Sequence, residues 1–308
     1  MSARWRDYLQ AAKPGIIAGN LMTAAGGYLL AARGGPAGLA ALLAGTGLVI
    51  ASGCVFNNCI DHRIDRRMVR TRGRPLAAGR MRLSAAAVYG AVLGAAGMLL
   101  LTSLQSGAVA ATVAGGWAVY VAVYTWLLKP RTMHAPLVGG LAGAAPPVAG
   151  YLAGGGAFDA GAALLAAMFL CWQMPHFYAI AIYRLDDYRA AGIPVLPLRR
   201  GVRAARRHGA LYACGFFAAA FLLSAWGYAG RGYLAAVSAL ALLWLVLALV
   251  PAGGYRAAAR RLFICSIVSI AVLTLMMGLN ATGPGRVQTP MIDASLSSAA
   301  AGGVNHHH

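Results

Sequence analysis

The stretch LAALLAGTGLVIASGCVFNN at residues 39–58, continued by CIDHRID at residues 59–65, joins a long apolar run to a group of acidic side chains. An apolar run of about 20 residues is long enough to span a hydrocarbon core about 30 Å thick. At its end Asn57, Asp61 and Asp65 recur every four residues, so on a helix their side-chain oxygens lie along one stripe. The stretch therefore predicts a membrane-spanning helix that ends in a cation-binding site.

The composition of the whole chain is that of a membrane protein. Of its 308 residues 60% are hydrophobic and 11% are charged, and the mean hydropathy is +0.66, whereas about a quarter of the residues of a soluble domain are charged. We predict an all-α, multi-pass membrane protein in which about nine transmembrane helices surround a central cavity that faces the cytoplasm. The predicted spans are residues 15–32, 39–58, 83–103, 107–128, 136–153, 158–183, 208–227, 231–252 and 262–281.

The basic residues predict which ends of these spans face the cytoplasm. Of the 26 lysines and arginines, 23 lie before the first span or in alternate loops, and only Arg33, Arg231 and Arg286 lie on the other side. The positive-inside rule then places the N-terminus and the active-site loops in the cytoplasm, in a plasma membrane of the bacterial (inner membrane) type. A soluble nucleic-acid binder could also carry a net charge of +19, but it would not sort that charge between loops, so we expect no nucleic-acid partner.

The chain is expected to form one transmembrane domain over residues 1–288, with the first span retained rather than cleaved as a signal peptide. Residues 289–308 are rich in Ala, Ser and Gly and end in His306-His307-His308. We expect them to be a disordered tail with the remnant of a purification tag.

A second acidic cluster follows the sixth span, in the sequence Tyr183-Arg184-Leu185-Asp186-Asp187. Adjacent aspartates point about 100° apart on a helix, so one can bind a metal while the other pairs with an arginine. An interfacial group of salt bridges is the alternative. However, four of the seven acidic residues lie in the two clusters on one predicted face, and acidic residues near a membrane are costly and usually functional.

The residue types in these clusters favour a diphosphate substrate bound through Mg²⁺. Mg²⁺ takes oxygen ligands and commonly bridges one or two carboxylates to substrate phosphates. A diphosphate held by a metal ion and arginines becomes a good leaving group, and aromatic faces stabilise the carbocation that an allylic hydrocarbon leaves behind. The arginines that follow the first cluster are Arg63, Arg66, Arg67, Arg70, Arg72 and Arg74. The aromatic candidates, for which belt or core packing is the alternative, are Tyr120, Tyr124, Trp126, Trp172, Phe177, Tyr178 and Tyr183.

Longer motifs resemble a known family. Asn57-x-x-x-Asp61-x-x-x-Asp65 followed by Arg70-Thr71-Arg72-x-Arg74-Pro75-Leu76 resembles the first aspartate-rich motif of the intramembrane aromatic prenyltransferases. Within that superfamily, Trp172-Gln173-Met174-Pro175-His176-Phe177-Tyr178-Ala179, continued by Tyr183-Arg184-x-x-Asp187-Tyr188, is similar to the protohaem IX farnesyltransferases, or haem O synthases. The resemblance runs from about Lys13 to Asn280.

This resemblance implies transfer of a farnesyl group from farnesyl diphosphate to a vinyl group of haem b, with water supplying a hydroxyl group, to form haem O. Mg²⁺ is the implied cofactor, and haem A synthase or terminal oxidase assembly proteins are candidate partners. Ala191 stands four places after Asp187, where the superfamily often has a second aspartate, so metal binding is expected to depend mainly on the first motif.

The expected site residues fall into two groups. The catalytic and metal-binding residues are Asn57, Asp61, Asp65 and Asp187, with Asp186 as a further metal ligand. The residues expected to bind substrate are Lys13, Asn20, Arg72, Arg74, Tyr124, Lys129, Trp172, His176, Tyr183 and Arg184. Among them, His176 is the candidate for a contact with the haem iron or a propionate. A histidine hydrogen-bonded between helices is the alternative.

Two other functions compete with this prediction. One is a prenyltransferase that acts on a quinone precursor or a chlorophyll-like acceptor. The other is a cation or proton-coupled transporter, in which paired acidic sites relay ions across the membrane. A transporter should carry acidic residues at mid-span, whereas these lie at span ends beside arginines.

Overall fold

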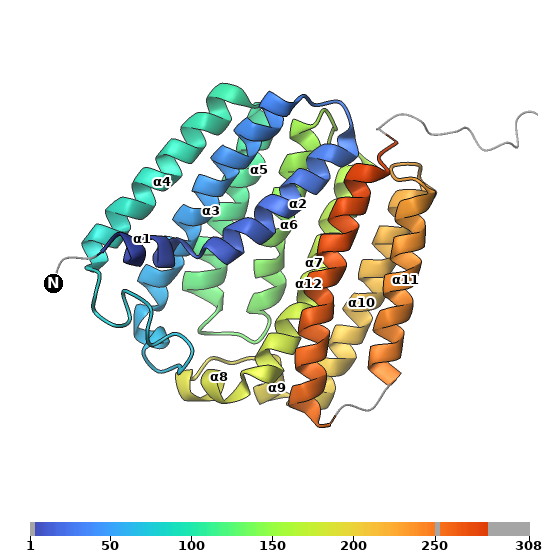
Figure 1. The fold of residues 1–308 in the computed structure, drawn as a ribbon. Coiled ribbons are helices and arrows are strands. Elements are labelled where there is room, and N and C mark those ends of the chain that lie inside the picture. Colours follow the sequence, from blue (N-terminus) through green and yellow to red (C-terminus); the bar gives the residue numbers. More distant parts are fainter. Residues whose placement is uncertain (1–3, 250–252, 283–308) are drawn as a thin grey trace, which may run out of the picture.

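The protein is built from helices that stand side by side in a bundle (Figure 1). The structure, a computed structural model, describes residues 4–249 and 253–282, and this part contains no β-strand. The long helices are apolar, so the chain is a multi-pass membrane protein. The tail predicted from residue 289 onward lies outside the described residues, and the boundary of the single domain stays a prediction.

Each predicted span coincides with a helix over its described residues; residues 250–252 of the span 231–252 lie outside them. Six of the helical segments in the described part are long and apolar enough to cross a membrane by themselves, and α2, α6 and α11 complete the nine predicted spans. The long helices are α2 (Pro14–Ala31), α3 (Pro36–Asp65), α4 (Leu83–Leu104), α5 (Gly107–Ala118) continued by the π-helix η1 (Val119–Leu128), α6 (Ala135–Ala153), α7 (Ala160–Tyr183), α10 (Gly201–Ala225), α11 (Arg231–Leu249) and α12 (Tyr255–Leu279). The short helices are α1 (Trp5–Ala12), α8 (Leu185–Ala191) and α9 (Leu196–Arg199).

Helix α3 carries the first acidic motif as part of one continuous helix. Its 30 residues correspond to a length of about 45 Å at 1.5 Å per residue, which exceeds the roughly 30 Å of the hydrocarbon core. The helix is therefore long enough to carry its last turns, with Asp61 and Asp65, past the apolar layer. The prediction that Asn57, Asp61 and Asp65 lie on one helix is confirmed.

Helices α2 and α6 pack with their backbones almost in contact. A Cβ atom added to Gly27 of α2 would lie 2.0 Å from the carbonyl oxygen of Pro147, and one added to Gly150 of α6 would lie 1.9 Å from that of Ala24. Only glycine allows such an approach. We call this close contact between the backbones of α2 and α6 the seam. Neither helix can shift relative to the other without breaking it.

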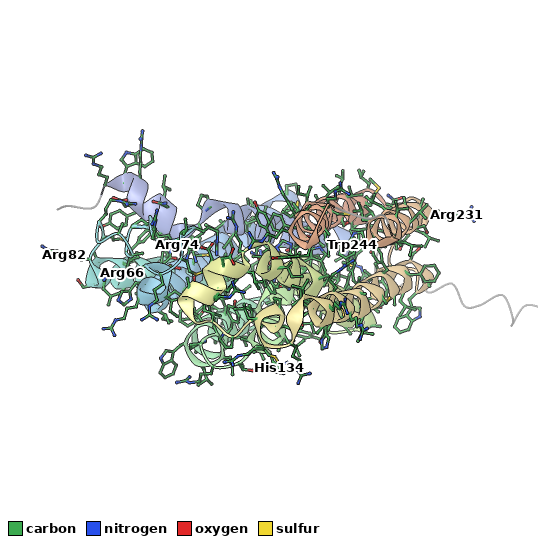
Figure 2. All side chains as sticks on the ribbon, turned by 90° about the horizontal axis from the view of Figure 1, so that it is seen from below. Arg66, Arg74, Arg82, His134, Arg231 and Trp244 are labelled. Carbon is green, nitrogen blue, oxygen red and sulfur yellow. The ribbon has the colours of Figure 1, made fainter. Side chains whose placement is uncertain are left out.

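Segment 66–82, α8 and α9 lie at the same end of the bundle, the lower end in Figure 1. We call this end the basic end, because the loops that follow the second and the sixth predicted span lie there, and these two loops contain more arginines than any other. Seen from this end (Figure 2), Arg74 lies nearer to the middle of the bundle than Arg82, which lies at its edge.

Candidate active site

A cavity of about 670 Å³ lies inside the bundle and reaches the basic end. Helices α2, α3, α6, α7 and α12 and the α5–η1 segment form its walls. Its volume is in the range of pockets that enclose small molecules. The lining is apolar along most of the wall and polar where α3 ends, so the cavity offers separate environments for a charged group and for an apolar one.

Asn57 connects three elements at the polar end of this cavity. Its Oδ1 accepts a hydrogen bond of 2.5 Å from Nζ of Lys13. Its Nδ2 donates to Oδ2 of Asp61 at 2.9 Å and to Oγ1 of Thr125 in η1 at 3.1 Å. Asn57 is only 4% exposed, and its amide is thus fixed in one orientation, with its carbonyl oxygen toward Lys13.

The two carboxylates of the motif are each held by a cation. Asp61 forms a salt bridge with Lys129 through Oδ2, while its buried Oδ1 has no hydrogen-bond partner in the described part of the chain. Asp65 accepts hydrogen bonds of 3.0 and 2.8 Å from Nη1 of Arg74. Buried charges are normally paired, so a carboxylate oxygen left without a partner marks a place for a further ligand.

Lys13 occupies an unusual backbone conformation between α1 and α2. Its φ of +56° lies in the left-handed region, which costs a residue with a side chain about 1–2 kcal/mol. Burial, and the nearby charge of Arg74, lower the pKa of the Lys13 ammonium to about 8. The strained turn places this lysine at the acidic motif.

Helix α1 supports that turn. Nδ2 of Asn58 donates to the carbonyl oxygen of Ala11 at 2.8 Å, and Nε of Arg80 donates to Oδ1 of Asp7 at 2.9 Å. Because Asn58 belongs to α3 and Arg80 to segment 66–82, α1 is attached to both elements that carry the site.

A π-helix, η1, forms part of the cavity wall beside Asn57. Over residues 119–128 each turn contains an extra residue, an uncommon conformation that often occurs at functional sites. It places Tyr120 and Tyr124 in the cavity wall with their rings stacked at 5.9 Å. Lys129 follows at the end of η1, with its backbone N–H bonded to the carbonyl oxygen of Tyr124.

On the opposite side of the cavity, two α7 rings are held by a single residue of α12. Nε1 of Trp172 donates to the carbonyl oxygen of Ser266 at 2.8 Å, and Nδ1 of His176 lies 2.8 Å from the hydroxyl oxygen of the same serine. The rings of Trp172 and His176 are stacked with centroids 5.0 Å apart. Both rings line the cavity.

The second acidic cluster joins surface elements of the basic end. Asp187 accepts a hydrogen bond of 2.9 Å from the backbone N–H of Val69. Asp186 is 62% exposed and forms salt bridges with Arg189 at 3.0 Å and Arg256 at 2.5 Å. Neither carboxylate is part of the cavity lining.

The structure brings most of the predicted site residues to one cavity. Those that line it are Lys13, Asn20, Asn57, Asp65, Arg74, Tyr124, Lys129, Trp172 and His176. Asp61 lies behind them, bonded to Asn57 and Lys129. Those outside the lining are Arg72, which is exposed, Tyr183, whose ring lies under the guanidinium of Arg184, Arg184 itself, Asp186 and Asp187. Their assigned roles stay predictions.

Three further residues take part although they are not among the expected site residues; Arg70 was named only as one of six arginines after the first cluster. Arg70 and Tyr188 line the cavity, and Ser266 bonds to Trp172 and His176. Ser266 could have been found from the sequence, since Ser266 and Ser269 stand within an otherwise apolar span. Polar residues in such spans are often functional.

The residues at the polar end fit a hard divalent cation. No group of three or more His, Cys, Asp or Glu side chains gathers within residues 4–249 and 253–282. Mg²⁺ does not need such a group, because it keeps several waters and uses one or two carboxylates together with substrate phosphates. The unpartnered Oδ1 of Asp61, with Asp65 and the carbonyl oxygen of Asn57 nearby, provides that smaller set of ligands.

Comparison with known protein sequences identifies the family. Residues 20–273 match the model of the UbiA prenyltransferase family. A Pseudomonas aeruginosa protein named protoheme IX farnesyltransferase 2 is 52% identical over 282 residues, which cover 89% of this chain and 94% of that protein. A Chromobacterium violaceum protein with the same name is 48% identical and covers 97% of this chain and 99% of its own length.

Solved structures share the fold at low sequence identity. A digeranylgeranylglyceryl phosphate synthase superposes with a TM-score of 0.73 at 16% identity, covering 89% of this chain and 97% of its own. A UbiA homologue from Archaeoglobus fulgidus bound to GPP and Mg²⁺ superposes with a TM-score of 0.65 at 15% identity, covering 89% of this chain and 99% of its own. At this level of identity the comparisons support the fold.

Proposed function

We propose a reaction for this chain from the premise that it belongs to the UbiA prenyltransferase family and is a membrane prenyltransferase. The reaction is transfer of a farnesyl group from farnesyl diphosphate to a vinyl group of haem b, with addition of water, to form haem O. The relatives that share about half of its residues are named for haem and farnesyl substrates, and the cavity has a polar end and an apolar wall that suit them.

The diphosphate of the donor would bind at the polar end. Asn57, Asp61 and Asp65 would hold Mg²⁺, which neutralises charge on the leaving diphosphate; a UbiA homologue has been solved with GPP and Mg²⁺. Lys13 and Lys129 line the cavity beside these residues. Their ammonium groups are placed to bind phosphate oxygens once their present partners turn to the cation.

Arg70 and Arg74 extend the same cationic surface. Both line the cavity, and guanidinium groups bind phosphate oxygens in bidentate geometry. Arg74 also holds Asp65, so it links the diphosphate to the metal motif. We propose that these two arginines take up the charge that develops on the leaving group. Arg72 is exposed and lies outside the cavity lining.

The stacked rings of Tyr120 and Tyr124 would face the allylic cation that forms when the carbon–oxygen bond breaks. Both tyrosines line the cavity and belong to η1, the element that Lys129 follows, so we infer that they lie between the diphosphate and the apolar part of the cavity. The apolar walls exclude water from this cation until the acceptor vinyl group has reacted. The farnesyl chain would lie along those walls.

Asp61 carries the proposal, because its buried Oδ1 has no partner within the described residues while its Oδ2 is bonded to Asn57 and Lys129. Replacing Asp61 with Asn should lower Mg²⁺-dependent release of diphosphate from farnesyl diphosphate by about 100-fold or more. Arg189→Gln, which breaks an exposed ion pair at the basic end, is the control and should stay near wild type, since exposed ion pairs contribute little. Unchanged release in Asp61→Asn would remove the basis for a metal site at this motif.

The acceptor is tested by the mass of the product. Purified protein in lipid nanodiscs, supplied with farnesyl diphosphate and Mg²⁺, should convert haem b to a product heavier by one farnesyl group and one hydroxyl group, the second proton of the water being released together with diphosphate. A hydroxybenzoate acceptor should remain unmodified. Prenylated hydroxybenzoate without prenylated haem would assign the chain to the alternative reaction on a quinone precursor.

The location and partners follow from the same proposal. The sorting of basic residues to one end of the bundle supports an inner membrane protein with the basic end in the cytoplasm. Haem A synthase and terminal oxidase assembly proteins are the partners we propose for delivery of the product.

A further inference from the structure

The imidazole ring of His176 is held in its orientation by two neighbouring aromatic rings. Trp172 stacks on it at 5.0 Å with an interplanar angle of 23°, and Phe263 of α12 lies at the same centroid distance with an angle of 33°. The rings are close enough for favourable aromatic contact. The polar contacts of the imidazole are made by its two nitrogen atoms, which lie on the edge of the ring.

The hydrogen bonds of Ser266 determine which nitrogen of His176 carries the proton. The hydroxyl group of Ser266 donates its hydrogen to the carbonyl oxygen of Phe263 at 2.7 Å. A hydroxyl group has one hydrogen, so towards His176 it can only accept, and Nδ1 of His176 must be the donor at 2.8 Å. In a neutral imidazole, the other nitrogen, Nε2, then holds an unshared electron pair.

Nε2 of His176 has no hydrogen-bond partner within the described part of the chain, and it is not enclosed by protein atoms. His176 is the one histidine among the described residues that line the cavity. The lone pair is therefore open to whatever occupies the apolar half of the cavity.

His176 and the metal motif belong to different walls of the cavity. Helices α3 and α7 both line the cavity, but α7 packs mainly on α6, α10 and α12 rather than on α3. A substrate held by His176 would therefore face the diphosphate end from the opposite wall.

We propose that Nε2 of His176 is the axial ligand to the iron of the porphyrin substrate, with Ser266 as the residue that positions it. The inference rests on the proposed haem acceptor and specifies how that acceptor is held. Neutral imidazole is a common ligand of haem iron, and a ligating histidine usually donates its other N–H to an oxygen atom, as His176 does to Ser266.

The same tautomer argues against a propionate as the partner of Nε2. A carboxylate accepts hydrogen bonds and has none to donate. An unprotonated Nε2 cannot donate either, so the two groups would face each other with unshared electron pairs. Iron supplies the empty orbital that this nitrogen requires, and Trp172 and Phe263 flank the imidazole beside it.

The test is a haem b titration of the full chain in nanodiscs, without farnesyl diphosphate, followed by the Soret band and by electron paramagnetic resonance of the ferric form. The wild type should show the spectrum of histidine-ligated haem. His176→Ala should lose it, and imidazole added to His176→Gly should restore it. His134→Ala, which removes an exposed histidine at the start of α6, is the matched control and should keep the wild-type spectrum.

Ser266→Ala should weaken haem binding by about 10- to 100-fold, because it removes the group that orients the ligand. Metal-free protoporphyrin IX, followed by its fluorescence, separates ligation from folding. It should bind wild type, His176→Ala and Ser266→Ala with similar affinity, since it has no iron to ligate. An equal loss of affinity for haem and for metal-free porphyrin in His176→Ala would overturn the assignment, because the side chain would then contribute to binding without ligating the iron.

The spectra also distinguish failure of this inference from failure of the proposed reaction. A histidine spectrum in His176→Ala would overturn the ligand assignment even if wild type makes prenylated haem. A spectrum that depends on His176 would support it even if the product assay shows another acceptor. A loss of prenylation in His176→Ala with an unchanged haem spectrum would assign the residue to proton transfer and overturn the inference.

Discussion

The carboxylate of Asp187 accepts a hydrogen bond of 2.9 Å from the backbone N–H of Val69, which joins α8 to the segment that follows α3. The two residues are 118 positions apart in the chain. The contact therefore holds two parts of the basic end together. Arg70, which lines the cavity, comes directly after Val69, so the bond also fixes the start of the cationic surface.

Two substitutions of Asp187 separate this contact from a metal-ligand role. Asp187→Asn keeps an oxygen that can accept from Val69, and we expect it to retain most of the activity. Asp187→Ala removes the acceptor and should raise the KM for farnesyl diphosphate by about fivefold, equivalent to a hydrogen bond of about 1 kcal/mol. Steady-state kinetics at saturating Mg²⁺ provide the measurement. Equal and severe losses in both variants would instead indicate that the charge of Asp187 binds metal.

Removing Lys129 should destabilise the protein strongly. The salt bridge with Asp61 is buried, the lysine side chain being 19% exposed and the aspartate 1%. Lys129→Ala leaves that carboxylate without its cation, which typically costs about 3–5 kcal/mol. Added Mg²⁺ should reduce the deficit, because an ion at Asp61 replaces the missing charge.

Thermal unfolding in detergent, with and without Mg²⁺, measures this effect. Arg189→Ala removes one partner of the exposed salt bridge with Asp186 and should change stability by less than about 1 kcal/mol. A Lys129→Ala protein as stable as that control would mean that Asp61 is not a buried charge in the folded protein.

The seam between α2 and α6 predicts a severe effect from one added methyl group. Gly27→Ala would place a Cβ atom 2.0 Å from the carbonyl oxygen of Pro147. Backbone atoms cannot move aside, so the helices must separate, and we expect little folded protein. Gly115→Ala in α5 meets no atom within 4 Å and should be neutral or stabilise the helix by up to about 1 kcal/mol. Yield and monodispersity in size-exclusion chromatography compare the two variants.

The attachment of α1 should depend on pH through Asp7. The hydrogen bond from Arg80 and that from the backbone of Arg4 lower the pKa of Asp7 below its ordinary value of 3.8. A carboxyl group with a lowered pKa in the folded protein stabilises it fully above about pH 4 and loses this contribution as the pH falls through the folded-state value. Limited proteolysis within α1 should therefore accelerate below pH 4 in the wild type.

Asp7→Asn provides the comparison for this pH effect. It lacks the titrating group, so its α1 should be cleaved faster than that of the wild type at pH 7, with little further change on acidification. A variant whose cleavage still accelerates at low pH would assign the effect to another group.

The sequence was sufficient to predict the helices and one half of the site. Long apolar runs predicted all nine helical spans because span length is set by the thickness of the membrane. The four-residue spacing of Asn57, Asp61 and Asp65 placed them together because the period of the α-helix is known in advance. The residues that contact them in the fold could not be predicted in this way. Nothing in the local sequence shows that Lys13 adopts a left-handed conformation, since that depends on contacts between α1 and α3.

Three other features were beyond sequence reasoning for similar reasons. The π-helix changes which side chains of residues 119–128 face the cavity, and the apolar sequence there is equally compatible with an α-helix. The roles of adjacent Asp186 and Asp187 depend on Val69 and Arg256, which are distant in the chain. His176 was recognised as a candidate, but its tautomer follows only from the hydrogen bonds of Ser266.

The pairing of Lys13 with Asn57 and of Lys129 with Asp61 has a consequence for the order of events in the site. A metal ion that takes those oxygens releases two ammonium groups, which then need anions. A diphosphate supplies the anions, but it draws the lysines away from Asn57 and Asp61, which then need a cation. Each arrival thus lowers the cost of the other, and such coupling is reciprocal. We expect Mg²⁺ and prenyl diphosphate to bind cooperatively, each with a higher affinity when the other is already in the cavity.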